Sequence, residues 1–470
     1  MHLFLVEDDS NVAGVFEDFC SRKQARLTIA TNLQDALTVV DAGANSFDLA
    51  VCDLKIPATA GAVDEAVEFG LVILQKLIEK WPGVPIIVLS AFGTIDVVSD
   101  MMLDARQVDI YGTGASQPML RFFQKARLLD AVDGIGQALR HLEAVAQIEL
   151  HAPALTEEYR QALRIFARRK GGTLVEYQPL AGGRSGARTG LATVRSGDGA
   201  QKAHVVAKLT THDRATSEKD RYRGHVSGRL GAASYADLTE EVSAGCGASA
   251  GLFYSVADVF NRDLFRVLDS DAAGAAAVVT TMAALCAPWM AGVPQTPKTW
   301  ADVRRNLIQD ADYELVARNY SIVAVGDDRA VQTRWTSQHG DLHGANILVD
   351  DTLRPVLIDY GRTGDASSVL DPITLELSAI FHPDSPLRDD VWPTSDDLGR
   401  WGDLDAYLAR CPYPNFVRAC RAWSDAVRCG ERDLFATVTA FCLRNLQFAD
   451  VDKARALALQ VYSADRLNSA

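Results

Sequence analysis

The chain has 470 residues, of which 48% are hydrophobic and 23% are charged, and its net charge is −14. A chain of this length is too long for a single hydrophobic core, so we predict two or three domains. The composition is that of an ordinary soluble globular protein. The eight cysteines show no CxxC pair and no histidines at zinc spacing, which argues against a zinc ribbon or disulfide framework and fits a reduced, cytoplasmic setting. Residues 1–6 are apolar but lead directly into Glu7, Asp8 and Asp9 without a basic segment, so we expect no signal peptide.

The charge is unevenly distributed along the chain. Residues 1–150 hold 21 Asp and Glu against 11 Lys and Arg, which is −10, whereas residues 156–230 hold 7 against 15, which is +8. An acidic N-terminal part is a poor partner for nucleic acid. The basic segment can serve phosphate groups, an acidic partner or the acidic N-terminal part, or it can consist of solvated helix faces.

Short apolar runs alternate with helical patterns in the first 150 residues. We predict strands at residues 3–6, 27–30, 47–52 and 84–89, and helices at residues 11–24 and 32–41. This alternation predicts a parallel sheet covered on both faces, with its chemistry at the carboxyl ends of the strands. Glu7, Asp8, Asp53 and Ser90 all fall at such ends.

This part resembles the receiver domain of two-component response regulators, which is a doubly wound, flavodoxin-like α/β fold. The resemblance implies that Glu7, Asp8 and Asp53 bind Mg²⁺, and that Asp53, in DLKIP, is the phosphoacceptor. It also implies that Ser90 and Lys125 bind the phosphoryl group. A carboxylate can attack a phosphoryl group once a divalent cation relieves the repulsion between the two anions.

The sequence departs from the receiver pattern around Lys125. Its context, FFQKARLLDAV, places Phe122 at the aromatic switch position, but Ala126 replaces the usual proline. Lys125 follows Ser90 by 35 residues, more than family members usually show, and residues 57–70 also look expanded. A receiver that folds but takes no phosphate is therefore the alternative.

Residues 128–170 have helical periodicity with a break near residues 151–153. The apolar stripe between Leu128 and Val145 fits the last receiver helix packed on its sheet, and its extension past Leu142 fits a dimer or interdomain helix. We therefore predict a receiver domain at residues 1–150. A helical linker at residues 151–170 is expected to follow it.

A glycine-rich turn separates two predicted strands at residues 174–179 and 191–195. Gly182, Gly183 and Gly186 would let backbone amides approach phosphate oxygens, with Ser185 among them. The turn lacks the GK[ST] ending of a P-loop and the last glycine of a GxSxG elbow, so by itself it is a weak signal.

The apolar run at residues 205–208 ends in Lys208 and resembles the VAIK strand of kinases. The resemblance implies that Lys208 pairs with the α and β phosphates of ATP. Glu218 is our choice for its acidic helix partner. The alternatives are Asp220, Glu240 and Glu241.

A strand at residues 251–256 would lead to an adenine-contacting hinge at residues 257–260, which ends a nucleotide-covering lobe at residues 171–265. Helical patterns dominate residues 266–470. The apolar stretch at residues 272–293 fits a buried helix better than a membrane span, because it contains threonines and Pro288 and follows acidic residues. We expect a loop at residues 363–368 and irregular structure at residues 381–401.

Three polar side chains stand at fixed offsets in residues 339–361, HGDLHGANILVDDTLRPVLIDYG. Asp341 precedes Asn346 by five residues, and Asp359 follows Asn346 by thirteen. Phosphoryl transfer from ATP needs a carboxylate that positions the attacking hydroxyl and two oxygen ligands for Mg²⁺. The flanking apolar residues predict two strands and a turn, at residues 347–349, 356–358 and 350–354. The alternative is that His339 and Asp341 only cap a turn beside a hairpin.

The HGDLH form resembles the aminoglycoside and choline kinase branch of the protein-kinase-like phosphotransferases, which have an α+β bilobal fold. The resemblance implies that Asp341 is the catalytic base and that Asn346 and Asp359 are metal ligands. Tyr360 takes the place of Phe in DFG. Two roles are equally compatible with Asp371: it could brace this loop, or it could be the N-cap of a helix before a proline.

Together these resemblances predict a response regulator whose output domain is an ATP- and Mg²⁺-dependent phosphotransferase regulated by phosphorylation of Asp53. One alternative is a nucleotide-binding pseudokinase that signals by protein interaction. Another is a small-molecule kinase with a fused regulatory receiver. The implied partners are a sensor histidine kinase or other phosphodonor and an unknown phosphoryl acceptor. We expect that the protein binds neither nucleic acid nor a membrane, and that it could form a homodimer.

Overall fold

The computed structural model describes residues 1–470 except 44–45, 91–105, 181–185 and 470. The described residues form two compact units. The first unit comprises Met1–Ala215 and Leu238–Ser255, and the second comprises Thr216–Asp237 and Val256–Ala470.

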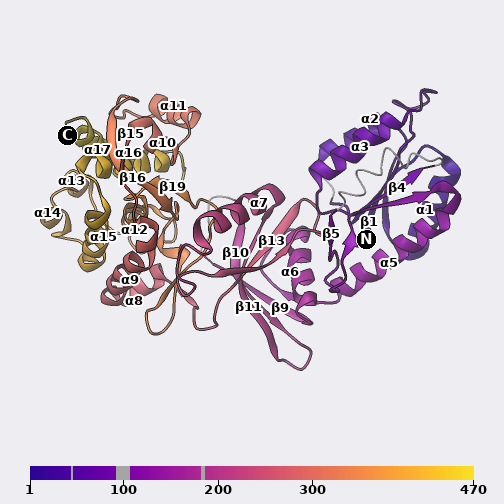
Figure 1. The fold of residues 1–470 in the computed structure, drawn as a ribbon, viewed down its shortest axis with the longest axis horizontal. Helices are drawn as coiled ribbons and strands as arrows, with labels where there is room; N and C mark the ends of the chain where they lie inside the picture. Colours follow the sequence, from indigo (N-terminus) through magenta and orange to yellow (C-terminus); the bar gives the residue numbers. More distant parts are fainter. Residues whose placement is uncertain (44–45, 91–105, 181–185, 470) are drawn as a thin grey trace. The chain divides into compact units, whose positions relative to one another are not determined.

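A five-stranded parallel sheet with strand order β2-β1-β3-β4-β7 forms the N-terminal part of the first unit. Its elements are β1 (His2–Val6), α1 (Ser10–Lys23), β2 (Arg26–Ala30), α2 (Leu33–Ala42), β3 (Leu49–Asp53), α3 (Val67–Lys80), β4 (Ile86–Ser90), β7 (Leu120–Gln124) and α5 (Leu128–Ala146). Helices α2 and α3 cover one face and α1 and α5 the other (Figure 1). Phe4 and Ile73 belong to the core of the first face, and Leu5 and Ile135 to that of the second. The predicted doubly wound, flavodoxin-like receiver fold is confirmed.

Local hydrogen bonds decide where the first two helices begin. The side chain of Asp9 accepts a hydrogen bond from the backbone of Asn11 and caps α1, and Asn32 caps α2 in the same way. Asp9 thus serves as a helix cap, whereas the other two acids of the turn, Glu7 and Asp8, directly follow β1.

A short hairpin, β5 (Gln107–Val108) and β6 (Gln117–Pro118), lies in the chain between β4 and β7. Ile110 and Tyr111 in its loop are buried in the receiver core beside α5. On the other side, the Arg169 guanidinium donates to the carbonyl oxygens of Asp109 at 2.6 Å and Glu241 at 2.7 Å. The hairpin therefore contacts both the receiver core and the sheet that follows it in the chain.

A six-stranded sheet with order β12-β13-β11-β10-β9-β8 forms the rest of the first unit. The elements around it are β8 (Glu149–His151), α6 (Glu157–Arg169), β9 (Leu174–Pro179), β10 (Arg188–Arg195), β11 (Gln201–Thr211), β12 (Asp237–Val242) and β13 (Ser249–Ser255). Helix α6 packs on the sheet, and its Phe166 ring stacks on Phe253 with 3.9 Å between centroids.

The structure confirms two helices in residues 128–170, α5 and α6, but the break between them begins earlier than we expected. Helix α5 already ends at Ala146, and residues 149–151 form the edge strand β8, which pairs parallel to β9. The α5 stripe is divided between two cores. Leu139 and Leu142 pack in the receiver, whereas Val145 packs with α6.

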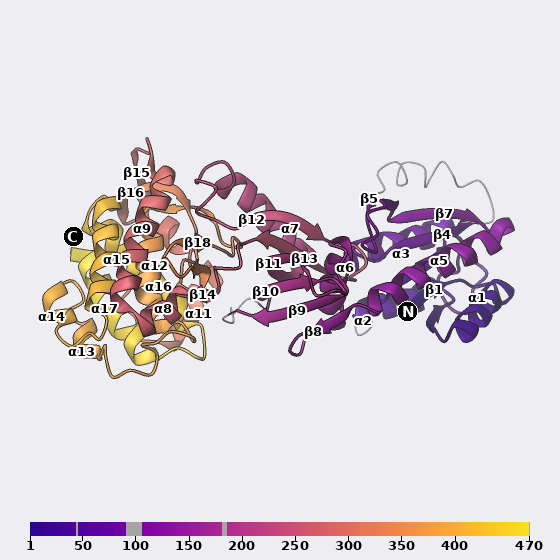
Figure 2. The same cartoon turned by 90° about the horizontal axis from the view of Figure 1, so that it is seen from below.

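The second unit is mainly helical. Its elements are α7 (His212–Arg221, which begins in the first unit), η2 (Tyr222–Val226), β14 (Arg262–Asp263), α8 (Leu264–Ser270), α9 (Ala272–Met290), β15 (Gln295–Thr299), α10 (Trp300–Arg305), α11 (Asp310–Asn319), β16 (Ala330–Gln338), η3 (Gly344–Asn346), β17 (Ile347–Val349), β18 (Pro355–Leu357), β19 (Gly364–Ser367), α12 (Leu370–Phe381), α13 (Ser395–Leu398), α14 (Leu404–Leu408), α15 (Pro414–Val427), α16 (Glu431–Leu446) and α17 (Lys453–Ser469). Helix α15 packs against α9 and α12, and α16 against α12 and α17 (Figure 2). Along the chain, a six-stranded sheet is thus followed by a mainly helical unit, which is the order of elements that we predicted for the α+β part.

The short strands of the second unit position its polar loop. The predicted hairpin is confirmed, because β17 pairs antiparallel with β18 around residues 350–354. We expected a loop at residues 363–368. This expectation is wrong, because residues 364–367 form β19, which pairs antiparallel with β16. Among the described residues one helix, α9, is long and apolar enough to cross a membrane by length and composition. In this structure α9 packs against α8 and α15.

Candidate functional sites

The carboxyl ends of four parallel strands bring the predicted receiver residues together. Glu7 follows β1, Asp53 ends β3, Ser90 ends β4 and Lys125 follows β7. Strand register aligns the three later positions, because Asp53 pairs with Leu89 and Ser90 pairs with Gln124. Phe122 lies on β7 opposite Val88 and is partly buried.

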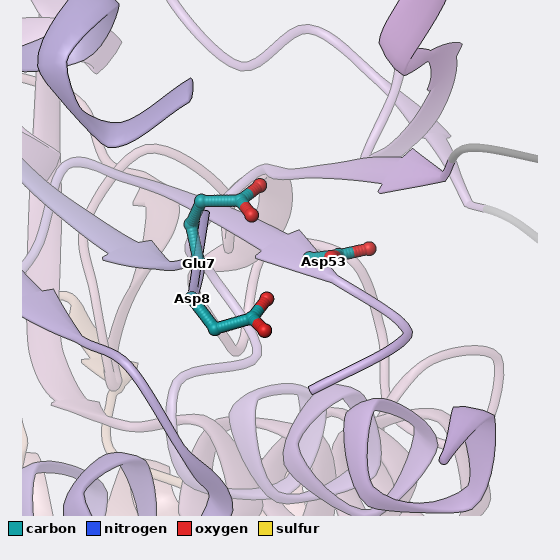
Figure 3. A group of neighbouring side chains, drawn as sticks. All are labelled: Glu7, Asp8 and Asp53. Atoms are coloured by element: carbon teal, nitrogen blue, oxygen red, sulfur yellow. The ribbon is translucent and has the colours of Figure 1, made fainter. Parts of the chain in front are cut away.

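The acids of this site lie close enough to share one cation. One ligand oxygen from each of Glu7, Asp8 and Asp53 lies within 4.8 Å of the others (Figure 3). The Lys125 ammonium is 2.7 Å from Glu7 Oε1 and 2.7 Å from Asp53 Oδ2. The structure thus brings Lys125 together with Glu7 and Asp53, although Ala126 follows it where the receiver pattern has a proline.

Burial controls the electrostatics of this cluster. Glu7 is fully buried, and burial raises its pKa to about 7, an effect that outweighs the hydrogen bond from Lys125. Burial also raises the pKa of Asp8. For Lys125 burial disfavours the charge, but hydrogen bonds with Asp53 and Glu7 outweigh this effect and raise its pKa.

The donor set fits Mg²⁺, which prefers oxygen ligands. Glu7 Oε2 is buried and has no hydrogen-bond partner within the described residues, as expected for an atom that a cation would satisfy. Glu7, Asp8 and Asp53 could therefore hold the metal, and Lys125 is placed to contact a phosphoryl group on Asp53.

In the second unit, hydrogen bonds hold the polar loop between β16 and β17. The carboxylate of Asp371, in the first turn of α12, accepts from the backbone N–H groups of His339 at 2.7 Å and Gly340 at 3.0 Å. Gly340 has a φ of 77°, and a Cβ there would lie 2.4 Å from the Arg362 carbonyl oxygen. Asp371 is therefore a brace of this loop, and the residue that caps α12 is Val369.

Asn346 ties the loop to the strand end that carries Asp359. Its Nδ2 donates to the Asp341 carbonyl oxygen at 2.9 Å and to His343 Nε2 at 3.1 Å, so Oδ1 is the atom that can ligate a cation. The Ile358 N–H donates to the Asn346 carbonyl oxygen at 3.1 Å. Asp359 follows directly with a φ of 66°, in the left-handed region that is uncommon for a residue with a side chain. The amide and carboxylate oxygens of Asn346 and Asp359 are of the type that Mg²⁺ prefers.

The carboxylate of Asp341 forms an ion pair that the sequence did not predict. Arg444, on α16, places Nη2 3.0 Å from Asp341 Oδ1. Burial opposes the charge of Asp341, but the positive charges of Arg444 and Arg362 outweigh it and hold the pKa well below its usual range. Arg444 lies more than a hundred residues from the loop and belongs to an ordinary helix, so no local pattern pointed to it.

The remaining predicted residues can be placed singly. Lys208 is buried on β11 in the first unit, whereas Glu218 is buried on α7 in the second, so their pairing stays a prediction. Glu218 Oε1 accepts a hydrogen bond from the Tyr360 backbone at 3.4 Å. The alternative partner Glu240 forms an ion pair with Lys170.

Only one of the predicted residues in the glycine-rich turn can be described. Gly186 is exposed and has a φ of 74°, a value that glycine adopts without strain. Gly182, Gly183 and Ser185 lie outside the described residues.

Comparisons with known proteins give fold similarity only. No family model matches the chain, and no curated protein matches it. A CheY-like response regulator receiver domain protein from Methanospirillum hungatei is 19% identical, with 30% of this chain and 96% of that chain covered and a TM-score of 0.23. A receiver domain protein from Clostridium thermocellum is 17% identical, with 31% and 98% covered and a TM-score of 0.23. An aminoglycoside-3'-phosphotransferase of type VIII is 17% identical, with 62% and 100% covered and a TM-score of 0.36.

Proposed function

We propose that this chain is a response regulator whose output domain transfers the γ-phosphoryl group of ATP to an acceptor hydroxyl. The observation that carries the proposal is the hydrogen-bonded loop in which Asp371 fixes the backbone before Asp341 and Asn346 joins Asp341 to the Asp359 strand end. A loop that only capped a turn would not need the side-chain oxygens of Asp341, Asn346 and Asp359. A phosphotransferase needs all of them.

The chemistry follows from the roles of these side chains. The acceptor oxygen forms a bond to the γ-phosphorus, the bond from that phosphorus to the β,γ-bridging oxygen breaks, and ADP leaves. The acceptor proton passes to the Asp341 carboxylate and then to solvent. Asn346 and Asp359 would hold Mg²⁺, which offsets the negative charge of the phosphates. Lys208, with Glu218 as its partner, would contact the α and β phosphates, and Gly182, Gly183, Ser185 and Gly186 would cover them.

We further propose that the receiver controls this reaction. Asp53 would accept a phosphoryl group from a sensor histidine kinase or another phosphodonor, with Glu7 and Asp8 completing the metal site. Ser90 and Lys125 would then bind the phosphoryl oxygens. This proposal includes a receiver domain, a linker and two lobes, at residues 1–150, 151–170, 171–265 and 266–470. It also includes a cytoplasmic location and a possible homodimer.

A second candidate is a pseudokinase that binds nucleotide and signals by protein interaction. The ion pair between Asp341 and Arg444 favours it, because a base held by a guanidinium is a weaker acceptor for a proton. The third candidate, a small-molecule kinase with a fused receiver, differs from the first only in its acceptor.

Replacing the base separates these candidates. We expect Asp341→Ala to fold and to bind Mg·ATP as the parent does, but to lose turnover by about 10²- to 10⁴-fold, the usual contribution of a general base. ADP release and nucleotide affinity are measured on the same preparations of the full chain. Asp351→Ala, an exposed carboxylate in the β17–β18 turn, is the matched control. Turnover of Asp341→Ala within a few-fold of the parent would exclude Asp341 as the base. An inactive parent that still binds nucleotide would favour the pseudokinase.

A further inference from the structure

Three arginines from separate elements lie at the Asp341 carboxylate or at the stretch of chain that follows Asp359. Arg444 contacts the Asp341 carboxylate from α16. Arg362 follows Asp359 and donates through Nη2 to the Asn306 carbonyl oxygen at 3.3 Å. Arg221, at the end of α7, donates through Nη1 to the Thr363 carbonyl oxygen at 2.9 Å. All three belong to the second unit.

These guanidiniums repel one another. Arg362 is exposed, but the protein around it removes part of its hydration, and this effect together with the positive charge of Arg444 lowers its pKa to about 10. Asp341 contacts Arg444, and Arg362 is the second guanidinium whose charge acts on it. Of the other two carboxylates at this loop, Asp371 accepts two backbone hydrogen bonds and Asp359 is the proposed metal ligand. Asp365, another acid on this stretch of chain, lies 3.6 Å from the His225 ring. Two guanidiniums, Arg444 and Arg362, therefore act on the single carboxylate of Asp341, and an anionic ligand would relieve the repulsion between them.

The surroundings of Asp341 also limit the size of that ligand. The side chain of Asp341 is 29% exposed and that of Arg444 only 14%. The rings of His343 and His382 lie with 4.2 Å between centroids at an interplanar angle of 34°, and Phe265 packs against His382 at 5.2 Å. Such a recessed carboxylate suits a small molecule better than a segment of a folded protein.

We propose that the phosphoryl acceptor is a small hydroxyl compound that carries a carboxylate or phosphate group, and that Arg444 and Arg362 bind this group. This inference rests on the proposed function, because it assigns the substrate class of the same site. Arginine presents a planar fork of donors that matches carboxylate and phosphate oxygens. An acceptor anion that binds Arg444 would break the ion pair between Arg444 and Asp341. The Asp341 carboxylate could then accept the hydroxyl proton. A polycationic acceptor would meet repulsion at the same place.

The arginines could alternatively serve the transferred phosphoryl group. Arg362 lies three residues after the metal ligand Asp359 and is compatible with that role. Arg444 contacts the carboxylate that positions the acceptor, so Arg444 is the residue that tests acceptor recognition.

The test measures binding to the full chain with the nucleotide site filled by Mg²⁺ and a non-hydrolysable ATP analogue. The probes are inorganic phosphate, D-glycerate and glycerol 3-phosphate as anions, glycerol as the neutral compound, kanamycin as the polycation, and an acidic serine peptide. We expect at least one of the anions to bind more tightly than glycerol and kanamycin. A preference for D-glycerate or for glycerol 3-phosphate then identifies carboxylate or phosphate as the recognised group.

Variants make the assignment specific. Arg444→Gln should weaken anion binding by tenfold or more, with Arg444→Lys intermediate, while the affinity for the ATP analogue stays unchanged. Arg418→Gln, which removes another ion-paired arginine of the second unit, 2.7 Å from Asp405, should leave anion binding as it is. Thermal unfolding shows whether each variant is folded.

Three results would overturn the inference. They are anions that bind no more tightly than glycerol, an Arg444→Gln variant that binds them as the parent does, and an acidic peptide that binds more tightly than every small anion. Because binding is measured without turnover, failure of this inference differs from failure of the proposed function, which would appear as an absence of ADP formation.

Discussion

Carboxylates with shifted pKa values stand at both candidate sites, and their surroundings affect them differently. Burial raises the pKa of Glu7 and of Asp371, whereas the arginines beside Asp341 hold its pKa low. Glu7 and Asp341 could be identified from the sequence, because each lies in a local motif. The partner Arg444 could not, because an ion pair across more than a hundred residues leaves no periodic signal. For Asp371 the sequence left two readings, and only the hydrogen bonds to His339 and Gly340 decide between them.

The raised pKa of Glu7 predicts pH-dependent metal binding at the receiver. Below pH about 7 the acid holds a proton that the metal must displace, so affinity for Mg²⁺ should rise by about tenfold between pH 6 and pH 8. In the absence of metal, the raised pKa of Glu7 makes the free energy of unfolding fall, rather than rise, as the pH increases. The stability contributed by protonated Glu7 is present below its ordinary pKa and is lost as the pH rises through about 7.

Isothermal titration with Mg²⁺ at the two pH values checks this prediction. Glu7→Gln should bind Mg²⁺ more weakly and should lose this contribution to the pH dependence. Glu17→Gln, on the exposed side of α1, serves as the control. Equal affinity of the parent at both pH values would show that Glu7 is not a ligand that must first lose a proton.

Strand length did not decide which elements were predictable from the sequence, because the three-residue strands β17 and β18 were predicted and the longer strands β7 and β16 were not. Four receiver strands appear as apolar runs, two of which end in acids, and the structure confirms them as β1, β2, β3 and β4. By contrast, β8 and β19 have three and four residues and exist because β9 and β16 supply hydrogen-bonding partners. A window of a few residues contains too little periodicity to indicate such a strand.

The β5–β6 hairpin is the element through which we expect the receiver to act on the sheet that carries Lys208. Its Asp109 carboxylate lies 3.4 Å from Arg169 Nε, and Arg168 Nη1 donates to the Tyr111 carbonyl oxygen at 3.0 Å. Hydrogen bonds to charged groups contribute about 1.5–3 kcal/mol each. Arg169→Ala should therefore increase amide hydrogen exchange in residues 107–118.

The matched control is Arg160→Ala on the same helix. Arg160 is paired with Glu157 at 3.5 Å, and both side chains are partly or largely exposed, so its loss should change exchange little. Equal protection of residues 107–118 in the parent and Arg169→Ala would mean that the arginine does not hold the hairpin.

At the scale of the whole molecule, the sequence predicted an acidic receiver next to a basic segment. The structure shows that two basic residues of that segment, Arg168 and Arg169, contact the receiver hairpin mainly through carbonyl oxygens. Gly83 adds main-chain hydrogen bonds to Gly247 at 2.9 Å and Gly245 at 2.8 Å. Hydrogen bonds of this kind are screened by salt less than exposed charge pairs, so net charge alone could not predict how the receiver attaches.

We propose that the phosphorylation state of Asp53 sets the rate of phosphotransfer. The most direct measurement is ADP formation by the full chain with Mg·ATP, with and without beryllofluoride as a mimic of the phosphoryl group on Asp53. We expect beryllofluoride to change the rate by about 5- to 150-fold, the usual range of allosteric coupling, and to have no effect on Asp53→Ala. A rate that beryllofluoride leaves unchanged, although it binds Asp53, would contradict the account.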